Sequence, residues 1–212
     1  QEMMPFKSIS ILSGPSFSNE VSQSLPTAVT LATKDKNDFE NISKLIPNKE
    51  FRIYYSNDLI GTQIGGALKN IYAIAAGIAE GLNLGENAKS ALISRSFAEM
   101  ARYAKKFKAD KNTLFGLSGL GDLILTCSSK NSRNTQFGIK LASSKYDNFL
   151  DLLKSQEVTE GYYTVKAVYN ISQKKNIDMP IMESVYNILY KQHDLKEELS
   201  NLLRRPITEE KI

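Results

Sequence analysis

The sequence predicts a mostly helical protein preceded by a short α/β segment, and three observations support this fold class. The first 57 residues hold short apolar runs bounded by Gly, Pro, Asn or Asp, which is typical of strands. After Asn57, apolar residues recur at intervals of three and four, which is typical of amphipathic helices. The 212 residues are 42% hydrophobic and 24% charged, a balance that indicates a folded globular chain. We therefore expect residues 1–57 to be the end of an α/β domain and residues 58–212 to form an all-helical domain.

Three strands and one connecting helix account for the first segment. The strands are expected at residues 9–12, 27–32 and 51–55. Between the last two, apolar side chains recur at helical spacing over residues 38–46. A helix between two strands is the usual crossover that makes them parallel, so the segment predicts the last βαβ unit of a larger sheet.

Helices follow almost without interruption. The first is long, and its apolar stripe comprises Ile60, Ile64, Leu68, Ile71, Ala75, Ile78 and Leu82. The second is expected over residues 86–107, with an inward face made of Ala88, Ala91, Leu92, Ala98, Ala101 and Ala104. Shorter helices are expected at residues 121–127, 132–142, 160–173, 180–191 and 195–203.

Composition excludes several classes of function. The single cysteine, Cys127, cannot form an internal disulfide, and with one histidine, His193, no Cys/His zinc cluster can form, so we expect no metal site. His193 lies in a polar run and is interpreted as a surface residue. The net charge of +4 is spread along the chain, which argues against a nucleic-acid partner.

Membrane insertion is not expected either. The longest stretch almost free of charge, residues 59–79, contains Lys69, polar amides and four glycines, so it predicts a buried helix instead of a bilayer span. The low cysteine content and the lack of an apolar leader in these residues favour a cytoplasmic location.

Lys69 is the first candidate for chemistry, because no other charged residue lies between Asp58 and Glu80. Positions three and four residues away along the helix are small, so another backbone or a ligand can approach this face closely. A desolvated lysine gives up its proton more readily and can act as a general base. The alternative is a lysine that extends to solvent along a glycine-packed helix, and the pattern alone leaves both interpretations open.

Asp122 is the second candidate. It follows the glycine-rich segment 116–121, and Thr126 lies four residues further on, on the same helical face. The functional interpretation is a buried carboxylate beside Lys69, and the structural alternative is an acidic residue that satisfies the first amides of a helix. The glycine order G-x-x-G-x-G differs from the dinucleotide fingerprint G-x-G-x-x-G, which no other segment matches.

Two further segments suit the binding of a phosphorylated ligand. Ser132, Arg133 and Asn134 open a predicted helix, where free amides, a guanidinium fork and neutral donors together suit a phosphate. The alternative, which the triplet by itself favours, is a capping serine with Arg133 and Asn134 facing solvent. Residues 13–17 follow a predicted strand, at the end where ligands of open α/β sheets bind. The alternative is that this segment is simply a turn.

In combination these segments resemble a known family. SGPSF, LPTAV, FRIYYSND, IGxxIGGALKNIYAIAAGI, GLSGLGDLILTC, SRNTQFG, EGYYT and MPIMESVYNILY occur in the order and approximate spacing of the bacterial-type NAD(P)-dependent glycerol-3-phosphate dehydrogenases. The resemblance covers residues 9–203. It departs from the family at residues 94–96, where Thr-Arg-Gly is usual, and at Tyr163, where an arginine is frequent.

The resemblance implies both a fold and a reaction. The fold is the multi-helix C-terminal domain of the 6-phosphogluconate dehydrogenase superfamily, preceded by the end of a Rossmann dinucleotide-binding domain. The reaction is the interconversion of sn-glycerol 3-phosphate and dihydroxyacetone phosphate with NAD or NADP, which supplies a glycerophospholipid precursor. A homodimer is also implied. The glycine fingerprint is absent from these 212 residues, so we expect them alone to be inactive. For the same reason, the sequence does not indicate which of the two cofactors is preferred.

The resemblance also implies a role for each candidate residue. Lys69 would carry the proton, Asp122 would hold Lys69, and Thr126 would assist. The residues expected to bind substrate are Gly14, Ser16, Lys69, Asp122, Ser132, Arg133 and Asn134. The residues expected to touch the dinucleotide are Ser18, Arg133, Val158 and Glu160.

Two other interpretations belong to different classes. Another hydroxyacid dehydrogenase of the same superfamily would share the helix lysine but would not need the phosphate-binding triplet. A non-catalytic helical interaction module would explain the missing glycine fingerprint.

Overall fold

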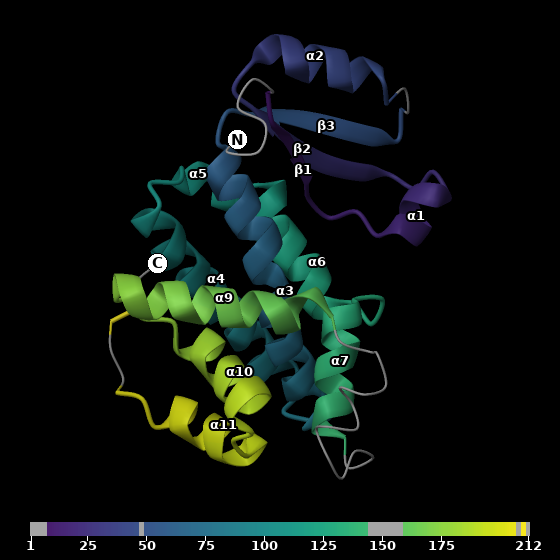
Figure 1. The fold of residues 1–212 in the computed structure, drawn as a ribbon. Coiled ribbons are helices and arrows are strands. Elements are labelled where there is room, and N and C mark those ends of the chain that lie inside the picture. The colour runs from purple at the N-terminus through teal and green to yellow at the C-terminus, as the bar shows by residue number, and fades with distance from the viewer. Residues whose placement is uncertain (1–7, 47–48, 144–158, 207–208, 211–212) are drawn as a thin grey trace.

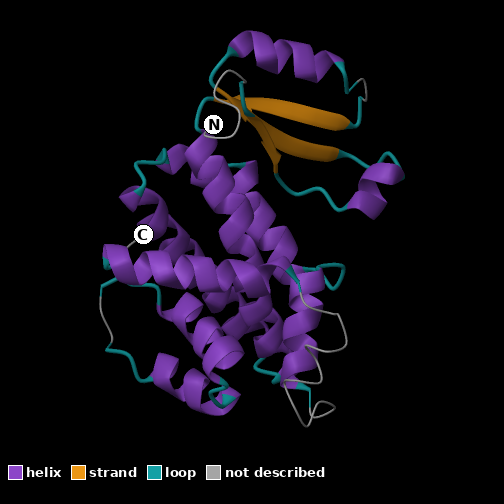
Figure 2. Ribbon diagram, viewed as in Figure 1, coloured by secondary structure: helices purple, strands orange, loops and turns teal. Residues whose placement is uncertain are grey.

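The structure is a computed structural model that describes residues 8–46, 49–143, 159–206 and 209–210. A small sheet with a helix on its outer side lies at one end of a larger helical body (Figures 1 and 2). This arrangement confirms the predicted fold class, a mostly helical chain that begins with a short α/β segment. Within the described residues, no helix combines the length and the apolar character needed to cross a bilayer.

The sheet has three strands in the order β1-β2-β3. They span Ser10–Ser13, Thr27–Thr33 and Phe51–Ser56, within one or two residues of the predicted strands. Strands β2 and β3 are parallel and are joined by helix α2, Lys36–Lys44, which confirms the predicted βαβ unit. Strand β1 runs antiparallel to β2.

Helix α2 begins and ends two residues earlier than the periodicity predicts. Asp35 precedes it, and its side chain accepts a hydrogen bond from the backbone N–H of Asn37 at 2.8 Å. An N-cap of this kind fixes the first turn through a polar residue that apolar spacing does not register. A second short helix, α1 (Ser18–Ser22), lies between β1 and β2 and was not predicted.

The helical body follows the predicted order closely. The helices among its described residues are α3 (Leu59–Gly81), α4 (Glu86–Lys106), α5 (Lys111–Phe115), α6 (Asp122–Ser128), α7 (Arg133–Ala142), α9 (Glu160–Lys175), α10 (Pro180–Lys191) and α11 (Leu195–Leu203). Helix α5 and a π-helical turn over Leu117–Gly121 were not predicted. Both are too short to show a periodicity of their own.

Helix α3 lies at the centre of the body and packs through its glycines. A Cβ atom on Gly65 would lie 2.0 Å from the carbonyl oxygen of Ser118, and one on Gly77 would lie 2.0 Å from that of Thr135. On the facing helix, a Cβ on Gly138 would lie 2.2 Å from the carbonyl oxygen of Ile74. Backbones therefore meet backbones along α3, as the small residues around Lys69 predicted.

Replacing Gly77 by alanine is expected to lower the free energy of unfolding by about 2 kcal/mol, because α7 must move away from α3 and overpacking outweighs the gain in helix propensity. Urea denaturation followed by circular dichroism measures this loss. The control is Gly121→Ala, since the nearest atom to a Cβ there lies 3.7 Å away. An equal effect of both substitutions would contradict the close approach of α3 and α7.

The predicted inward face of α4 is partly wrong. Ala91 is exposed, and the buried part of the helix is instead Ser96, Phe97, Ala98, Glu99, Met100, Tyr103 and Ala104. Ala98 and Ala104 of the predicted face are buried, whereas Ala88, Leu92 and Ala101 are half-buried. Aromatic residues and a glutamate on the second half carry the packing, and the alanine pattern did not indicate them.

Glu99 is a buried carboxylate that caps α10 from another helix. It is 1% exposed and accepts hydrogen bonds from the backbone N–H groups of Ile181 at 2.6 Å and Met182 at 3.1 Å. The hydroxyl of Tyr72 donates to the same carboxylate at 3.3 Å. The first turn of α10 has no capping side chain of its own, so Glu99 satisfies amides that would otherwise be buried without a partner.

Burial raises the pKa of Glu99 from 4.5 to about 7, although the N–H groups of Ile181 and Met182 act in the opposite direction. Between these two values the folded protein holds a proton that the unfolded chain has released. The extra proton on Glu99 therefore stabilises the folded state fully below pH 4.5. This stabilisation, roughly 3 kcal/mol, is lost as the pH rises through 7. Urea unfolding across this range, compared between the unaltered chain and Glu99→Gln, is expected to show this slope only in the former. Parallel pH curves would contradict it.

Candidate active site

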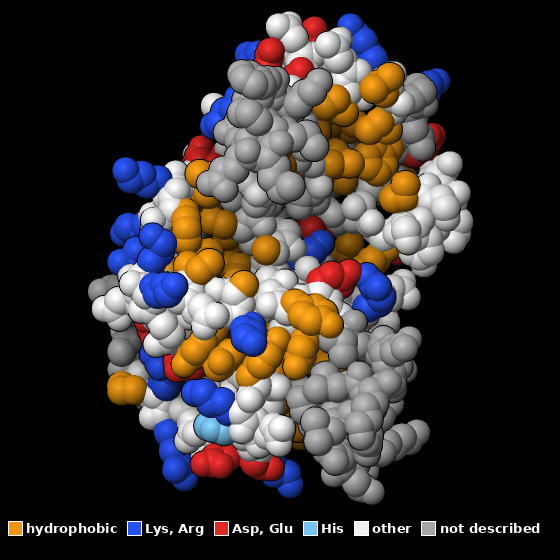
Figure 3. All heavy atoms as spheres, viewed as in Figure 1, with side chains coloured by type: hydrophobic (Ala, Val, Ile, Leu, Met, Phe, Trp, Pro, Cys, Tyr) orange, Lys and Arg blue, Asp and Glu red, His pale blue; other side chains and the backbone are white. Residues whose placement is uncertain are grey.

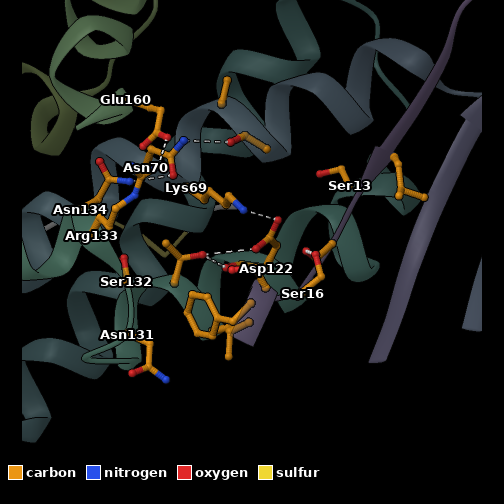
Figure 4. Close-up of a pocket in the computed structure, with 18 of the residues that line it drawn as sticks. Ser13, Ser16, Lys69, Asn70, Asp122, Asn131, Ser132, Arg133, Asn134 and Glu160 are labelled. Atoms are coloured by element: carbon orange, nitrogen blue, oxygen red, sulfur yellow. Dashed lines mark hydrogen bonds and ion pairs between the residues drawn. The ribbon is translucent and has the colours of Figure 1, made fainter. Parts of the chain in front are cut away.

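A cleft of about 920 Å³ lies between the sheet and the helical body. Its walls come from β1, the loop after it and the start of α1, from α3, α6 and the start of α7, and from the first residue of α9. The surface in Figure 3 is hollowed between these two parts of the molecule, and Figure 4 shows the side chains that line the cleft. Most of the residues that the sequence singled out therefore meet in one place.

Lys69 and Asp122 form an ion pair inside this cleft. The Lys69 ammonium donates to Asp122 Oδ2 at 2.6 Å, and the two side chains are 22% and 2% exposed. Asp122 is the first residue of α6, yet its carboxylate is buried against Lys69 instead of facing solvent at the helix end (Figure 4). A buried carboxylate therefore lies beside the lysine, as one interpretation of Asp122 expected, and the catalytic role of the pair stays a prediction.

The π-helical turn Leu117–Gly121 delivers Asp122 to this position. A Cβ on Gly119 would lie 2.1 Å from the carbonyl oxygen of Leu114, so only glycine allows the turn to fold so tightly onto α5. Single π-helical turns are frequent at functional sites. The glycine-rich segment thus shapes the backbone directly before a buried acid.

Thr126 contacts Asp122 as predicted from its spacing. Its hydroxyl lies 2.6 Å from the backbone oxygen of Asp122 and 3.3 Å from Oδ1, and Thr126 lines the cleft. The hydroxyl is thus engaged with Asp122, so any assistance to Lys69 passes through the carboxylate.

Ser132, Arg133 and Asn134 begin α7, but they differ in their surroundings. Ser132 caps the helix, with Oγ accepting from the N–H of Thr135 at 3.2 Å, and Arg133 forms an exposed ion pair with Glu160. Asn134 is 4% exposed, so the alternative in which it faces solvent is wrong. The reason is that α9 begins against it.

Asn134 joins three elements through its amide group. Its Oδ1 accepts from the N–H of Gly161 at 3.0 Å, and its Nδ2 donates to Asn70 Oδ1 at 3.0 Å. Asn70 lines the cleft beside Lys69 and is a residue that the sequence analysis missed. Its position could have indicated it, because its amide side chain is adjacent to the only lysine of an otherwise apolar helix.

The loop after β1 closes the opposite wall of the cleft. Gly14 has φ +148°, and a Cβ there would lie 3.0 Å from Cα of Val29, so this position requires glycine. The hydroxyl of Ser16 donates to the Gly14 carbonyl oxygen at 3.0 Å, and Ser18 also lines the cleft. Val158, the remaining predicted dinucleotide contact, lies outside the described residues.

Charge in the cleft is balanced, because each cation already faces a carboxylate. Lys69 pairs with Asp122, and Arg133 pairs with Glu160. The second pair is 76% and 54% exposed, so solvent screens it and an anion can reach Arg133. A guanidinium has five N–H donors and can hold a phosphate while it still contacts Glu160.

The two residues set aside on composition lie outside this cleft. Burial raises the pKa of Cys127 to about 12, so its thiol stays protonated and is no nucleophile at neutral pH. His193 lies near the C-terminus, with Nδ1 2.7 Å from Glu198 Oε1. Neither side chain is among the described residues that line the cleft.

Comparison with known proteins matches both parts of the chain to one enzyme family. Residues 58–200 match the family profile described as NAD-dependent glycerol-3-phosphate dehydrogenase C-terminus. Residues 1–39 match the profile of the N-terminus of the same enzymes.

Individual relatives carry the same name. The chain is 43% identical over 211 residues to glycerol-3-phosphate dehydrogenase [NAD(P)+] of Francisella tularensis, covering 99% of this chain and 63% of the relative. The corresponding enzyme of Solidesulfovibrio magneticus is 46% identical over 201 residues, covering 94% of this chain and 60% of the relative. The chain thus spans about three fifths of the length of the curated relatives it matches.

Solved structures agree with the fold described above. The crystal structure of glycerol-3-phosphate dehydrogenase from Coxiella burnetii superposes with a TM-score of 0.88 at 38% identity, covering 93% of this chain and 61% of that one. The Plasmodium falciparum enzyme gives a TM-score of 0.86 at 25% identity, covering 98% of this chain and 60% of that one. Profile, sequence and structure therefore agree, and the chain belongs to the NAD-dependent glycerol-3-phosphate dehydrogenase family.

Proposed function

We propose that this chain provides the substrate-binding and proton-transfer part of an NAD(P)-dependent glycerol-3-phosphate dehydrogenase. The observation that carries the proposal is the Lys69–Asp122 pair in one cleft with Ser132, Arg133 and Asn134. An ammonium that can exchange a proton and a set of donors for a phosphate are the two functions that a phosphorylated hydroxyketone requires of the protein. The substrate pair is dihydroxyacetone phosphate and sn-glycerol 3-phosphate.

The phosphate is held at the start of α7. Arg133 contributes charge and paired N–H donors, and Ser132 and Asn134 border the same wall of the cleft. The N-terminal end of α7 adds the positive end of the helix dipole. Ser132, Arg133 and Asn134 are called the phosphate cup below. Binding the phosphate away from the reacting carbon orients that carbon, so the phosphate cup contributes to rate as well as to affinity.

Lys69 transfers the proton at the oxygen on C2. In the direction of reduction its ammonium donates a proton to the ketone oxygen as C2 accepts a hydride, and the product is the secondary alcohol. In the direction of oxidation the neutral amine removes the proton from the hydroxyl group. Asp122 accepts a hydrogen bond from Lys69 and fixes the direction of its amino group, and Thr126 holds Asp122.

NAD or NADP would supply or accept the hydride when bound. The cleft is far larger than a three-carbon phosphate, which leaves room for a nicotinamide ring against the substrate. Glu160, Arg133 and Ser18 line that space with donors and acceptors, so the residues present fit a polar cofactor. We assign these three and Val158 to cofactor contacts, and Gly14 and Ser16 to the substrate wall. The proposal also includes an end of the α/β domain at residue 57. It further includes assembly of the enzyme as a homodimer and a location in the cytoplasm.

The test is an assay of the complete protein, with its upstream residues, for oxidation of NADH and NADPH by dihydroxyacetone phosphate. Turnover that depends on the phosphate group, with unphosphorylated dihydroxyacetone inactive, supports the proposal. Preference for a carboxylate-bearing hydroxyacid would instead favour another enzyme of the superfamily. Absence of both turnover and dinucleotide binding would favour an interaction module and contradict the proposal.

A further inference from the structure

Thr135 connects the two halves of the proposed site. It is 0% exposed and lies on α7, directly after Asn134. Its backbone N–H donates to Ser132 Oγ at 3.2 Å, and its hydroxyl donates to the carbonyl oxygen of Thr126 at 2.7 Å. A single buried residue therefore contacts both the serine of the phosphate cup and the threonine that binds Asp122.

The carbonyl group of Thr126 needs this donor. It is among the last four carbonyl groups of α6, which have no partner within their own helix. Thr126 is 5% exposed, so the hydroxyl of Thr135 takes the place that water would hold at an exposed helix end. With its carbonyl fixed in this way, Thr126 presents its own hydroxyl to Asp122.

Thr135 is itself fixed relative to Lys69. Its carbonyl oxygen lies against Gly77 of α3, where a Cβ would come within 2.0 Å, and α3 also carries Lys69. The helix that holds the lysine therefore sets the position of Thr135, and Thr135 sets the position of the residues that hold the carboxylate. This closes a loop of contacts around the Lys69–Asp122 pair.

We propose that Thr135 is a positioning residue that sets the geometry of the Lys69–Asp122 pair through Thr126 and aligns it with the phosphate cup. The inference rests on the function proposed above. The two contacts of Thr135 are separable, because its hydroxyl reaches the proton-transfer side and its N–H reaches the cup. Loss of the hydroxyl alone is therefore expected to reduce turnover and to spare substrate binding.

The variant Thr135→Val in the complete enzyme removes the hydroxyl and keeps the shape and the N–H. A lysine displaced by a fraction of an ångström transfers its proton poorly, so kcat is expected to fall about 10-fold or more while KM for dihydroxyacetone phosphate stays within about twofold. Thr135→Ser restores the hydroxyl and is expected to recover most of kcat. The matched control is Thr33→Val, at a threonine 1% exposed in β2 and away from the cleft.

A second measurement does not depend on catalysis. In protein labelled with ¹⁵N-lysine, the side-chain signal of Lys69, assigned by its loss in Lys69→Arg, is expected to move in Thr135→Val and to stay in place in Thr135→Ser and Thr33→Val. An unmoved Lys69 signal in Thr135→Val, or a kcat equal to that of Thr33→Val, would overturn the role of Thr135. Inactive unaltered enzyme with a displaced Lys69 signal in Thr135→Val would refute the proposed function but not the positioning.

Discussion

Lys69→Arg in the complete enzyme is expected to lower kcat by about 10²- to 10⁴-fold and to leave the fold intact. The loss corresponds to removal of general acid and base help, because a guanidinium keeps its proton throughout the range in which proteins are stable. Arginine retains the positive charge that Asp122, 2% exposed, requires in its buried position. Steady-state kinetics with dihydroxyacetone phosphate, together with urea denaturation, separates the two effects.

The control for this substitution is Lys89→Arg. Lys89 also forms a partly buried ion pair, with Glu80 at 2.7 Å and 12% exposure of its side chain, but it lies on α4 outside the cleft. The Lys89→Arg enzyme is expected to keep the activity of the unaltered enzyme. Near-normal turnover by Lys69→Arg, with stability unchanged, would show that another group carries the proton.

Arg133→Lys is expected to raise KM for the phosphorylated substrate by about 10- to 100-fold, although the charge is conserved. The expected loss is that of one or two charge-assisted hydrogen bonds, because an ammonium cannot reproduce the planar two-point contact of a guanidinium with phosphate. Inorganic phosphate and sulfate should inhibit the unaltered enzyme competitively, and both should inhibit the variant more weakly. Initial-rate kinetics at fixed ionic strength measures all three quantities.

Arg102→Lys is the matched control, because Arg102 lies on α4 and donates to the backbone oxygen of Asp178, away from the cleft. Its KM should be unchanged. If Arg133→Lys binds substrate as well as the unaltered enzyme and neither anion competes, the phosphate is held elsewhere.

Much of the fold follows from patterns in the sequence that act over short distances. The stripe of apolar residues on α3 and the proline that opens α10 are local signals, and both predict an element to within a few residues. The wrong inward face of α4 has the opposite origin. Ala91 satisfies the periodicity but faces solvent, since burial depends on which residues from elsewhere in the chain pack against that face.

The candidate site divides in the same way. Lys69 and Asp122 are conspicuous as charges in apolar surroundings, so the sequence identifies both, although their separation of 53 positions along the chain hides their contact. Asn70 and Thr135 are ordinary polar residues in helices. Their importance comes from partners on α7 and α6, and no local pattern encodes such partners.

The π-helical turn before Asp122 makes the spacing of this segment as consequential as its residue types. Each residue added to or removed from a helix rotates everything beyond it by about 100° about the axis. Loss of one residue within Leu117–Gly121 would therefore rotate Asp122 about the helix axis and carry its carboxylate away from Lys69, with every reacting side chain still encoded. Among natural variants of this chain, a one-residue deletion here should be as damaging as a substitution of the lysine itself, whereas substitutions that keep the backbone of the turn should be tolerated.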